Sequence, residues 1–97
     1  DVPALGTPAV LALMERAACD AVASAMEDGA TNVGVWAEIE HVAASKVGAE
    51  VVASAVLERA DTRSLEFTCD TREGDRIVAR GRHRRAIVDR GRFLERL

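Results

Sequence analysis

Two ionisable side chains stand where the hydrophobic pattern of the chain calls for apolar ones. Glu15 lies within the apolar arc of a predicted helix, four residues after Leu11 and three before Ala18. His41 ends the inward set of the first predicted strand. A buried carboxylate is costly unless it is paired or hydrogen-bonded, and histidine is a natural partner for it. If the helix packs on that strand, the two side chains would share one interface and suit acid–base or nucleophilic chemistry.

Thr7 lies two helical turns before Glu15, on nearly the same side of the helix, and could donate a hydroxyl hydrogen bond. Each of the three residues also has a purely structural explanation. Thr7 could only cap the helix, Glu15 could reach out to solvent, and His41 could be a satisfied residue at a strand end. The sequence leaves both explanations open.

The helix that would carry Thr7 and Glu15 is predicted from Thr7-Pro8 to about Glu27, because Pro8 fits a first helical position and Asp28-Gly29 is a typical stop. Its predicted buried face repeats at helical spacing and consists of Leu11, Met14, Ala18, Val22 and Ala25. Glu15 therefore belongs to a helix that should pack on another layer of structure.

After Gly29 the hydrophobic period changes from helical to alternating, which indicates strands. Four are expected, at about residues 33–41, 49–57, 65–70 and 76–88, with turns at 61–63 and 73–75 and a short helix within 89–97. In the first strand, the predicted inward set is Val33, Val35, Ala37, Ile39 and His41; in the second it is Ala49, Val51, Ala53, Ala55 and Leu57. One helix followed by four strands with short turns predicts an α+β fold, an antiparallel sheet wrapped around the helix.

The length of 97 residues suits one domain, residues 1–97, with a single core. Only 3% of the residues are aromatic, so the core must consist of small aliphatic side chains. Such a core buries little surface, which favours a homodimer or a higher homo-oligomer. Trp36, on the strand side away from the predicted inward set, points to a subunit interface or to burial under a loop.

Charge and cysteine content narrow the possible functions. The net charge of -3 predicts no general attraction to nucleic acid or to an anionic membrane, and no apolar run is long enough to span a bilayer. The start, Asp1-Val2-Pro3, shows no secretory leader, and Cys19 and Cys69 form no disulfide framework, so a cytoplasmic protein is expected. No cluster of side chains has metal-ligand spacing, so we expect neither a metal nor a cofactor.

Three stretches of the sequence resemble one known family. They read GTPAVLALME at 6–15, EHVAAS at 40–45 and GRHRRAIV at 81–88, and in this order and separation they are similar to the fluoroacetyl-CoA-thioesterase-like branch of the hotdog superfamily. The resemblance spans nearly the whole chain. It implies a hotdog fold and hydrolysis of a short or modified acyl-CoA thioester in a site where two subunits meet.

The same resemblance implies catalytic roles for Glu15, His41 and Thr7. Glu15 would act as nucleophile or general base on the thioester carbonyl, His41 would polarise the carbonyl or manage the proton, and Thr7 would orient the carboxylate. Members of the family usually carry a further strand before the helix, and the best-known enzyme also has an aromatic lid there. Only six residues precede Thr7, so both are missing from this sequence.

Substrate contacts are expected on the last predicted strand. Gly81 resembles the family's small residue that faces the helix; a bend in a long strand would explain it equally. Alternation places Arg80, Arg82 and Arg84 on one side, where Arg82 and Arg84 could bind the phosphates of coenzyme A. The alternative is a solvated outer face whose arginines pair with acids on neighbouring strands.

Two other functions fit the same pattern. A hotdog domain can bind or sense acyl-CoA without catalysis, although binding alone does not need an internal carboxylate. A hotdog enoyl-CoA hydratase also uses a histidine together with an acid. The spacing of Thr7 and Glu15 favours the thioesterase, and a substrate panel that contains an enoyl-CoA would separate the two enzymes.

Overall fold

The computed structural model describes residues 4–97, and its first regular element is the expected helix, α1 (Thr7–Val22). Every fourth residue of α1 is buried against the sheet: Val10, Met14, Ala18 and Val22. The predicted face was one residue off at its start, because Val10 is fully buried whereas Leu11 is only half-buried. Regular helix also ends earlier than predicted, and exposed Ala25 closes a short 3-10 turn, η1 (Ala23–Ala25).

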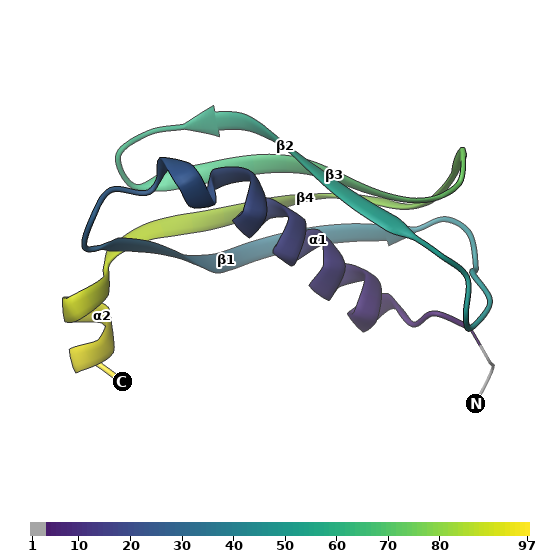
Figure 1. Ribbon diagram of the computed structural model, residues 1–97, viewed down its shortest axis with the longest axis horizontal. Coiled ribbons are helices and arrows are strands. Elements are labelled where there is room, and N and C mark those ends of the chain that lie inside the picture. The colour runs from purple at the N-terminus through teal and green to yellow at the C-terminus, as the bar shows by residue number, and fades with distance from the viewer. Residues whose placement is uncertain (1–3) are drawn as a thin grey trace.

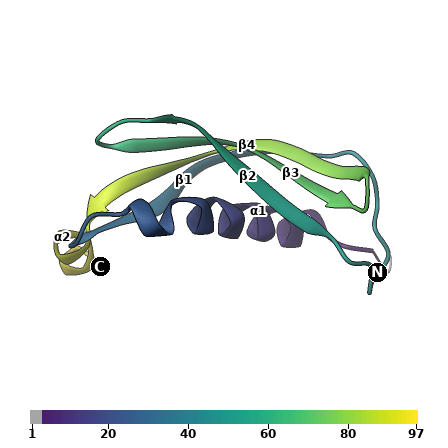
Figure 2. The same ribbon diagram turned by 45° about the horizontal axis from the view of Figure 1, so that its top comes forward.

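Four antiparallel strands follow, in the spatial order β1-β4-β3-β2. They are β1 (Ala30–His41), β2 (Val52–Ala60), β3 (Ser64–Glu73) and β4 (Arg76–Asp89), and a short helix, α2 (Arg90–Glu95), ends the chain. The long α1 lies under one face of the curved sheet (Figures 1 and 2). The predicted α+β arrangement, a sheet wrapped around one helix, is confirmed, as is the helix near the C-terminus.

The centre of the core lies between α1 and β3. Leu65, Phe67 and Cys69 alternate inward from β3, and all three are buried. Burial raises the pKa of the Cys69 thiol, and the neighbouring Asp70 carboxylate raises it further. A raised pKa keeps the thiol protonated, so Cys69 packs as a small apolar side chain rather than serving as a nucleophile.

A β-bulge interrupts β1 at Val35. Gly34 pairs with Arg85 of β4 and Trp36 pairs with Arg84, so the register shifts between these two pairs. Because directly paired residues share a face of the sheet, Gly34 points toward α1 while Trp36 points away. The predicted alternation is therefore wrong for Val33, which shares the face of Trp36, and Val35 is 53% exposed.

The edge strand β2 also departs from the simple alternation. Ala53 and Ala55 pack against the core as predicted. Leu57 pairs directly with the buried Phe67 and so faces inward as predicted, but it is 41% exposed, and the pairing of β2 with β3 shifts just after it. The predicted first members of the inward set, Ala49 and Val51, precede the strand.

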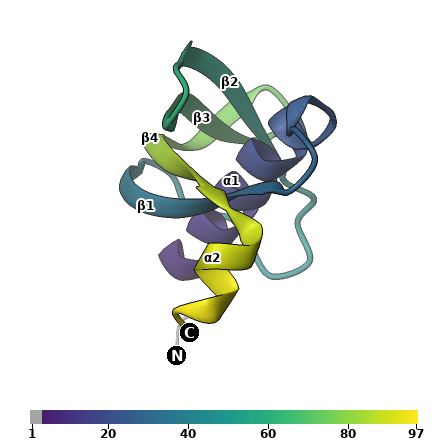
Figure 3. The ribbon, with the colours of Figure 1, turned by 90° about the vertical axis from the view of Figure 1, so that its left-hand side faces the viewer.

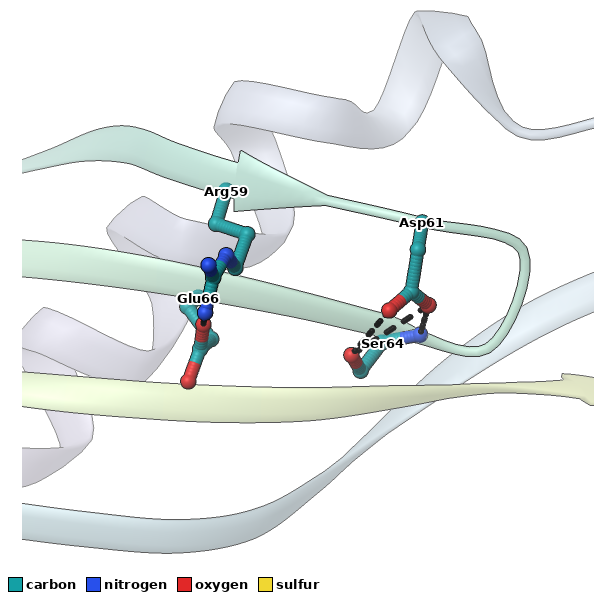
Figure 4. A network of polar contacts seen from close by, with 4 residues as sticks. All are labelled: Arg59, Asp61, Ser64 and Glu66. Carbon is teal, nitrogen blue, oxygen red and sulfur yellow. Dashed lines mark hydrogen bonds and ion pairs between the residues drawn. The ribbon is translucent and has the colours of Figure 1, made fainter.

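Both predicted turns are present. Gly74, at a positive φ of 59°, makes the tight β3–β4 turn. In the β2–β3 turn, the Asp61 carboxylate accepts hydrogen bonds from the backbone N–H groups of Arg63 and Ser64, each 2.8 Å long. Figure 4 shows Asp61 beside Ser64, next to the exposed ion pair of Arg59 and Glu66. The two backbone bonds hold the pKa of Asp61 below its ordinary value, so the ionised form fixes this turn.

Candidate active site

Thr7 and His41 meet where the start of α1 crosses the end of β1. The Thr7 hydroxyl Oγ1 lies 3.0 Å from His41 Nδ1. Thr7 is the first residue of α1, Gly6 occupies the capping position, and none of the described side chains caps the helix. The explanation of Thr7 as a helix cap is therefore wrong, because its hydroxyl bonds a histidine on another element.

The second ring nitrogen of His41 has no hydrogen-bond partner in the part of the chain that the structure describes. Within residues 4–97, Nε2 of His41 is buried and makes no hydrogen bond. Buried polar atoms in folded proteins are nearly always paired, so an orphaned ring nitrogen needs a functional or solvent explanation. If His41 were only a strand-end residue with its hydrogen bonds satisfied, both ring nitrogens would have partners. The contact with Thr7 satisfies Nδ1 and leaves Nε2 unexplained.

Glu15 lies elsewhere on the inner face, over Gly34 of β1. A Cβ atom added to Gly34 would lie 3.1 Å from Glu15 Oε2, 3.2 Å from Arg85 Nη1 and 3.2 Å from His83 Cε1. A carboxylate, a guanidinium and an imidazole thus converge above a residue without a side chain. Glu15 is half-buried, so its carboxylate belongs to the interface between α1 and the sheet.

The structure does not bring Glu15 to His41 within one protomer. Gly34, beside which the Glu15 carboxylate lies, is seven residues before His41 in β1. At ~3.3 Å per strand residue, that separation is roughly 20 Å. Thr7 and His41 form one cluster, and Glu15 belongs to a second.

A hydrogen-bond network fixes the Arg85 side chain in the second cluster. Arg85 is 7% exposed; its Nε donates to Asn32 Oδ1 and its Nη1 lies 3.1 Å from His83 Nε2. His83 Nδ1 in turn lies 2.8 Å from the carbonyl oxygen of Trp36. A carbonyl can only accept and a guanidinium can only donate, so His83 is neutral, with its proton on Nδ1. In this part of the molecule, no carboxylate among the described residues lies within ion-pair distance of Arg85.

Sequence reasoning did not single out Arg85, His83 or Gly34. The signal was present for two of them, because alternation along β4 from Gly81 places His83 and Arg85 on the inward side. Gly34 had no such signal, since the bulge at Val35 decides which way it faces.

The three predicted substrate contacts lie on both faces of β4. Gly81 is on the inner face, but an added Cβ there would collide with the carbonyl oxygen of Glu38, so the close approach is to β1 rather than to the helix. Arg82 lies on the outer face and forms an exposed ion pair with Glu38 at 3.1 Å. The Arg84 guanidinium lies 5.7 Å from the centre of the Trp36 ring. The alternative of pairing with neighbouring acids thus describes Arg82 and its neighbour Arg80, which binds Glu40.

Two further classes of site were sought in the described residues. Between residues 4 and 97, no group of three or more His, Cys, Asp and Glu side chains is placed to hold a metal ion. None of the helices in this range has the length and apolar character needed to cross a membrane.

Comparison with known proteins identifies the family. The model of a family described as fluoroacetyl-CoA-specific thioesterase matches residues 1–91. The structure of the fluoroacetyl-CoA thioesterase FlK is 27% identical, with a TM-score of 0.89 over 96% of this chain and 69% of that chain. An FlK variant in complex with acetyl-CoA is 25% identical, with a TM-score of 0.92 over 98% and 71% of the two chains.

A hot-dog-like protein from Thermanaerovibrio acidaminovorans, 21% identical, has a TM-score of 0.90 over 97% of this chain and 70% of that chain, and supports the fold alone. A search of curated proteins gives no match. The family model covers nearly all of the sequence, and the similar structures share the sheet wrapped around one helix. The chain therefore belongs to the fluoroacetyl-CoA-specific thioesterase family, and it is a thioesterase with the predicted α+β hotdog fold.

Proposed function

We propose that this chain hydrolyses a short or modified acyl-CoA thioester to the free acid and coenzyme A, in a site shared by two copies of the chain. The observation that carries the proposal is the cluster above Gly34. There the Glu15 carboxylate and the buried, hydrogen-bonded Arg85 guanidinium converge on the backbone of Gly34, so closely that a side chain at residue 34 would crowd both. A positioned carboxylate can act as the nucleophile or general base in acyl transfer from a thioester, and a fixed cation can stabilise the negative charge that develops.

Glu15 would act on the carbonyl carbon of the thioester, either by attacking it or by taking a proton from water that attacks it. If water attacks, the carbonyl carbon gains a bond to the water oxygen, its bond to sulfur breaks, and the proton taken from water leaves with coenzyme A as the thiol. If the Glu15 carboxylate attacks, the acyl group is first transferred to it as an anhydride and coenzyme A leaves as the thiolate. Water then cleaves the anhydride, which releases the free acid, restores the Glu15 carboxylate and supplies the proton of the thiol. Arg85 stands beside Glu15 and would stabilise the negative charge that develops during this step. Its network with Asn32 and His83 keeps the guanidinium in place, so little reorganisation is needed at the moment of reaction.

Thr7 and His41 would act on the carbonyl oxygen of the thioester, with His41 as the hydrogen-bond donor. If the Thr7 hydroxyl donates to Nδ1 of His41, Nε2 carries the ring proton and becomes a hydrogen-bond donor. This nitrogen is the one that makes no hydrogen bond to residues 4–97. A donor aimed at the thioester oxygen polarises the carbonyl, which is the role expected for His41 from the family resemblance.

A second copy of the chain would unite the two clusters. Within the described residues, β1 is an edge strand that pairs only with β4, and Val35 and Trp36 beside the bulge are 53% and 43% exposed. An open edge with exposed apolar residues favours pairing with another strand. The bulge also gives Gly34 and His41 the same face despite their odd spacing. Antiparallel pairing of two β1 strands about an axis midway between them would therefore bring Glu15 of one protomer to His41 of the partner subunit.

The three predicted substrate contacts on β4 and the predicted cellular location also bear on the proposed function. Gly81 lies on the inner face, where it pairs with Ile39, two residues before His41. Arg82 and Arg84 point away from Glu15, so they would contact only a coenzyme A that crosses the open edge of β1. A cytoplasmic location is supported by two free cysteines, Cys19 and Cys69, which suit a reducing compartment.

The experiment is free-thiol release from short, branched, halogenated and aryl acyl-CoAs, with an enoyl-CoA assayed for hydration in parallel. We expect thiol release from at least one short acyl-CoA and no hydration. Hydration without thiol release would instead establish the hydratase. Tight acyl-CoA binding with no turnover of any substrate would contradict the proposal and establish the binding module.

A further inference from the structure

In the part of the chain that the structure describes, only neutral groups hold the buried Arg85 guanidinium. Its Nε donates to Asn32 Oδ1, its Nη2 donates to the carbonyl oxygen of Asn32 at 3.3 Å, and its Nη1 donates to His83 Nε2 at 3.1 Å. A buried arginine is ordinarily paired with a carboxylate, because burial of an unpaired charge is costly. None of the ion pairs among residues 4–97 includes Arg85. Its charge is therefore held in place without being cancelled.

The Glu15 carboxylate lies close to Arg85 but is not paired with it. A Cβ atom added to Gly34 would lie 3.1 Å from Glu15 Oε2 and 3.2 Å from Arg85 Nη1, so both groups border the same residue of β1. A guanidinium has five N–H groups, and Asn32 and His83 take three of them. The other two, one on Nη1 and one on Nη2, make no hydrogen bond to the described residues and remain for a reacting group.

Two contacts apart from Arg85 fix the ring of His83. The ring stacks on Phe67 of β3, with centroids 6.3 Å apart, and its Nδ1 donates to the carbonyl oxygen of Trp36 at 2.8 Å. Because Nδ1 donates, the neutral ring offers Nε2 as an acceptor to Arg85. Asn32 reaches Arg85 from β1, which lies beside β4 in the sheet (Figure 3). The two acceptors are thus set by neighbouring strands before any substrate binds.

We propose that Asn32 and His83 are positioning residues of the thioesterase site, which hold Arg85 through neutral acceptors so that its full positive charge acts on the thioester. A carboxylate in either place would also fix the guanidinium, but it would cancel the charge. A fixed, uncancelled cation stabilises the negative charge that develops in the transition state. This inference rests on the proposed function, because it concerns the same reaction.

The first test replaces the amide of Asn32 by a carboxylate of the same shape. Asn32→Asp keeps an oxygen within reach of Arg85 Nε but pairs the cation. The urea midpoint of unfolding should rise, whereas kcat for thiol release should fall about tenfold or more with KM little changed, because Arg85 acts on charge that develops only in the transition state. A residue that only supported the fold would not lower kcat while raising stability.

Two precautions make the Asn32→Asp result specific to Arg85. A new carboxylate also favours the protonated form of a neighbouring carboxyl group, so kcat is compared at its alkaline plateau. Ser54→Asp is the control, because Ser54 is exposed on β2 between the inward-facing Ala53 and Ala55. It adds the same charge on the other face of the sheet and should keep the wild-type kcat. Wild-type kcat in Asn32→Asp, or a lower urea midpoint, would overturn the role of Asn32.

The second test separates the acceptor of His83 from its ring. His83→Phe keeps a ring against Phe67 but removes the acceptor for Arg85, and kcat should fall about 10²-fold. His83→Gln returns a neutral acceptor oxygen to the end of the side chain and should recover at least about tenfold of that loss. Equal losses of kcat in these two variants would show that His83 only fills space.

Nitrogen NMR of the His83 ring gives a readout that needs no turnover. The chain has two histidines, so His41→Ala leaves the signals of His83 alone. They should show a neutral ring with its proton on Nδ1. A proton on Nε2 would leave no acceptor for Arg85 and would refute the inference even in an active thioesterase. If the wild type hydrolysed no thioester, the proposed function would fail, while the ring spectrum and the urea midpoint of Asn32→Asp would still decide how Arg85 is held.

Discussion

Glu15→Gln is expected to lower kcat for thioester hydrolysis by roughly 10²–10⁴-fold, because glutamine can neither attack the carbonyl nor take a proton from water. The side chain keeps its shape, so packing above Gly34 should be preserved. The free energy of unfolding should therefore change by no more than about 1 kcal/mol. Thiol release under saturating acyl-CoA and urea denaturation of the same samples measure the two quantities.

Glu27→Gln is the matched control for this prediction. Glu27 follows the short turn after α1 and is exposed, away from the cluster around Arg85. Its variant should retain the wild-type rate. Turnover near the wild-type rate in Glu15→Gln would show that another group performs the chemistry.

Gly81→Ala is expected to lower the free energy of unfolding by about 3 kcal/mol, the upper part of the range for an overpacked interior. The added methyl group would overlap the carbonyl oxygen of Glu38 and crowd the backbone of Ile39. Backbone atoms of a paired strand cannot swing aside as a flexible side chain can, so β1 must shift away from β4. Urea denaturation of the purified variant measures the loss.

Gly91→Ala serves as the control for the same substitution elsewhere. Its Cβ would lie 3.5 Å from Asp89 Oδ1, an ordinary contact, and alanine favours the helical conformation of α2. This variant should match or slightly exceed the wild type in stability. If Gly81→Ala were equally stable, the close approach of β1 and β4 would not constrain residue 81.

The sequence predicted the strands correctly where the alternation of apolar and polar residues matches the alternation of buried and exposed side chains. The strict alternation of β3 is an example, because each of its inward residues meets the core. It failed at Val35 for a physical reason. Val33, Val35 and Ala37 suit either face, so no polar residue marks the extra position that the bulge inserts, and pairing with Arg84 and Arg85 decides the register.

The site was predictable in its chemistry but not in its geometry. Glu15 and His41 stood out because each is ionisable on an apolar face. Glu15 and His41 lie apart because an α-helix advances less per residue than a β-strand does. Eight residues of α1 from Thr7 to Glu15 advance about 12 Å, whereas the stretch of β1 from His41 back to Gly34 is roughly 20 Å long. Which strand residue lies under Glu15 depends on the angle between the elements, and no sequence pattern specifies it.

The central claim, a thioesterase site shared by two copies of the chain, is tested most directly by mixing two inactive variants. Glu15→Gln and His41→Ala are co-expressed with different tags, and the hybrid dimers are assayed for thiol release. If Glu15 of one protomer works with His41 of the partner subunit, each hybrid has one intact site, and a random mixture regains about a quarter of the wild-type rate. If the mixture stays as inactive as the separate variants although hybrid dimers form, the two residues do not act across an interface and the account is contradicted.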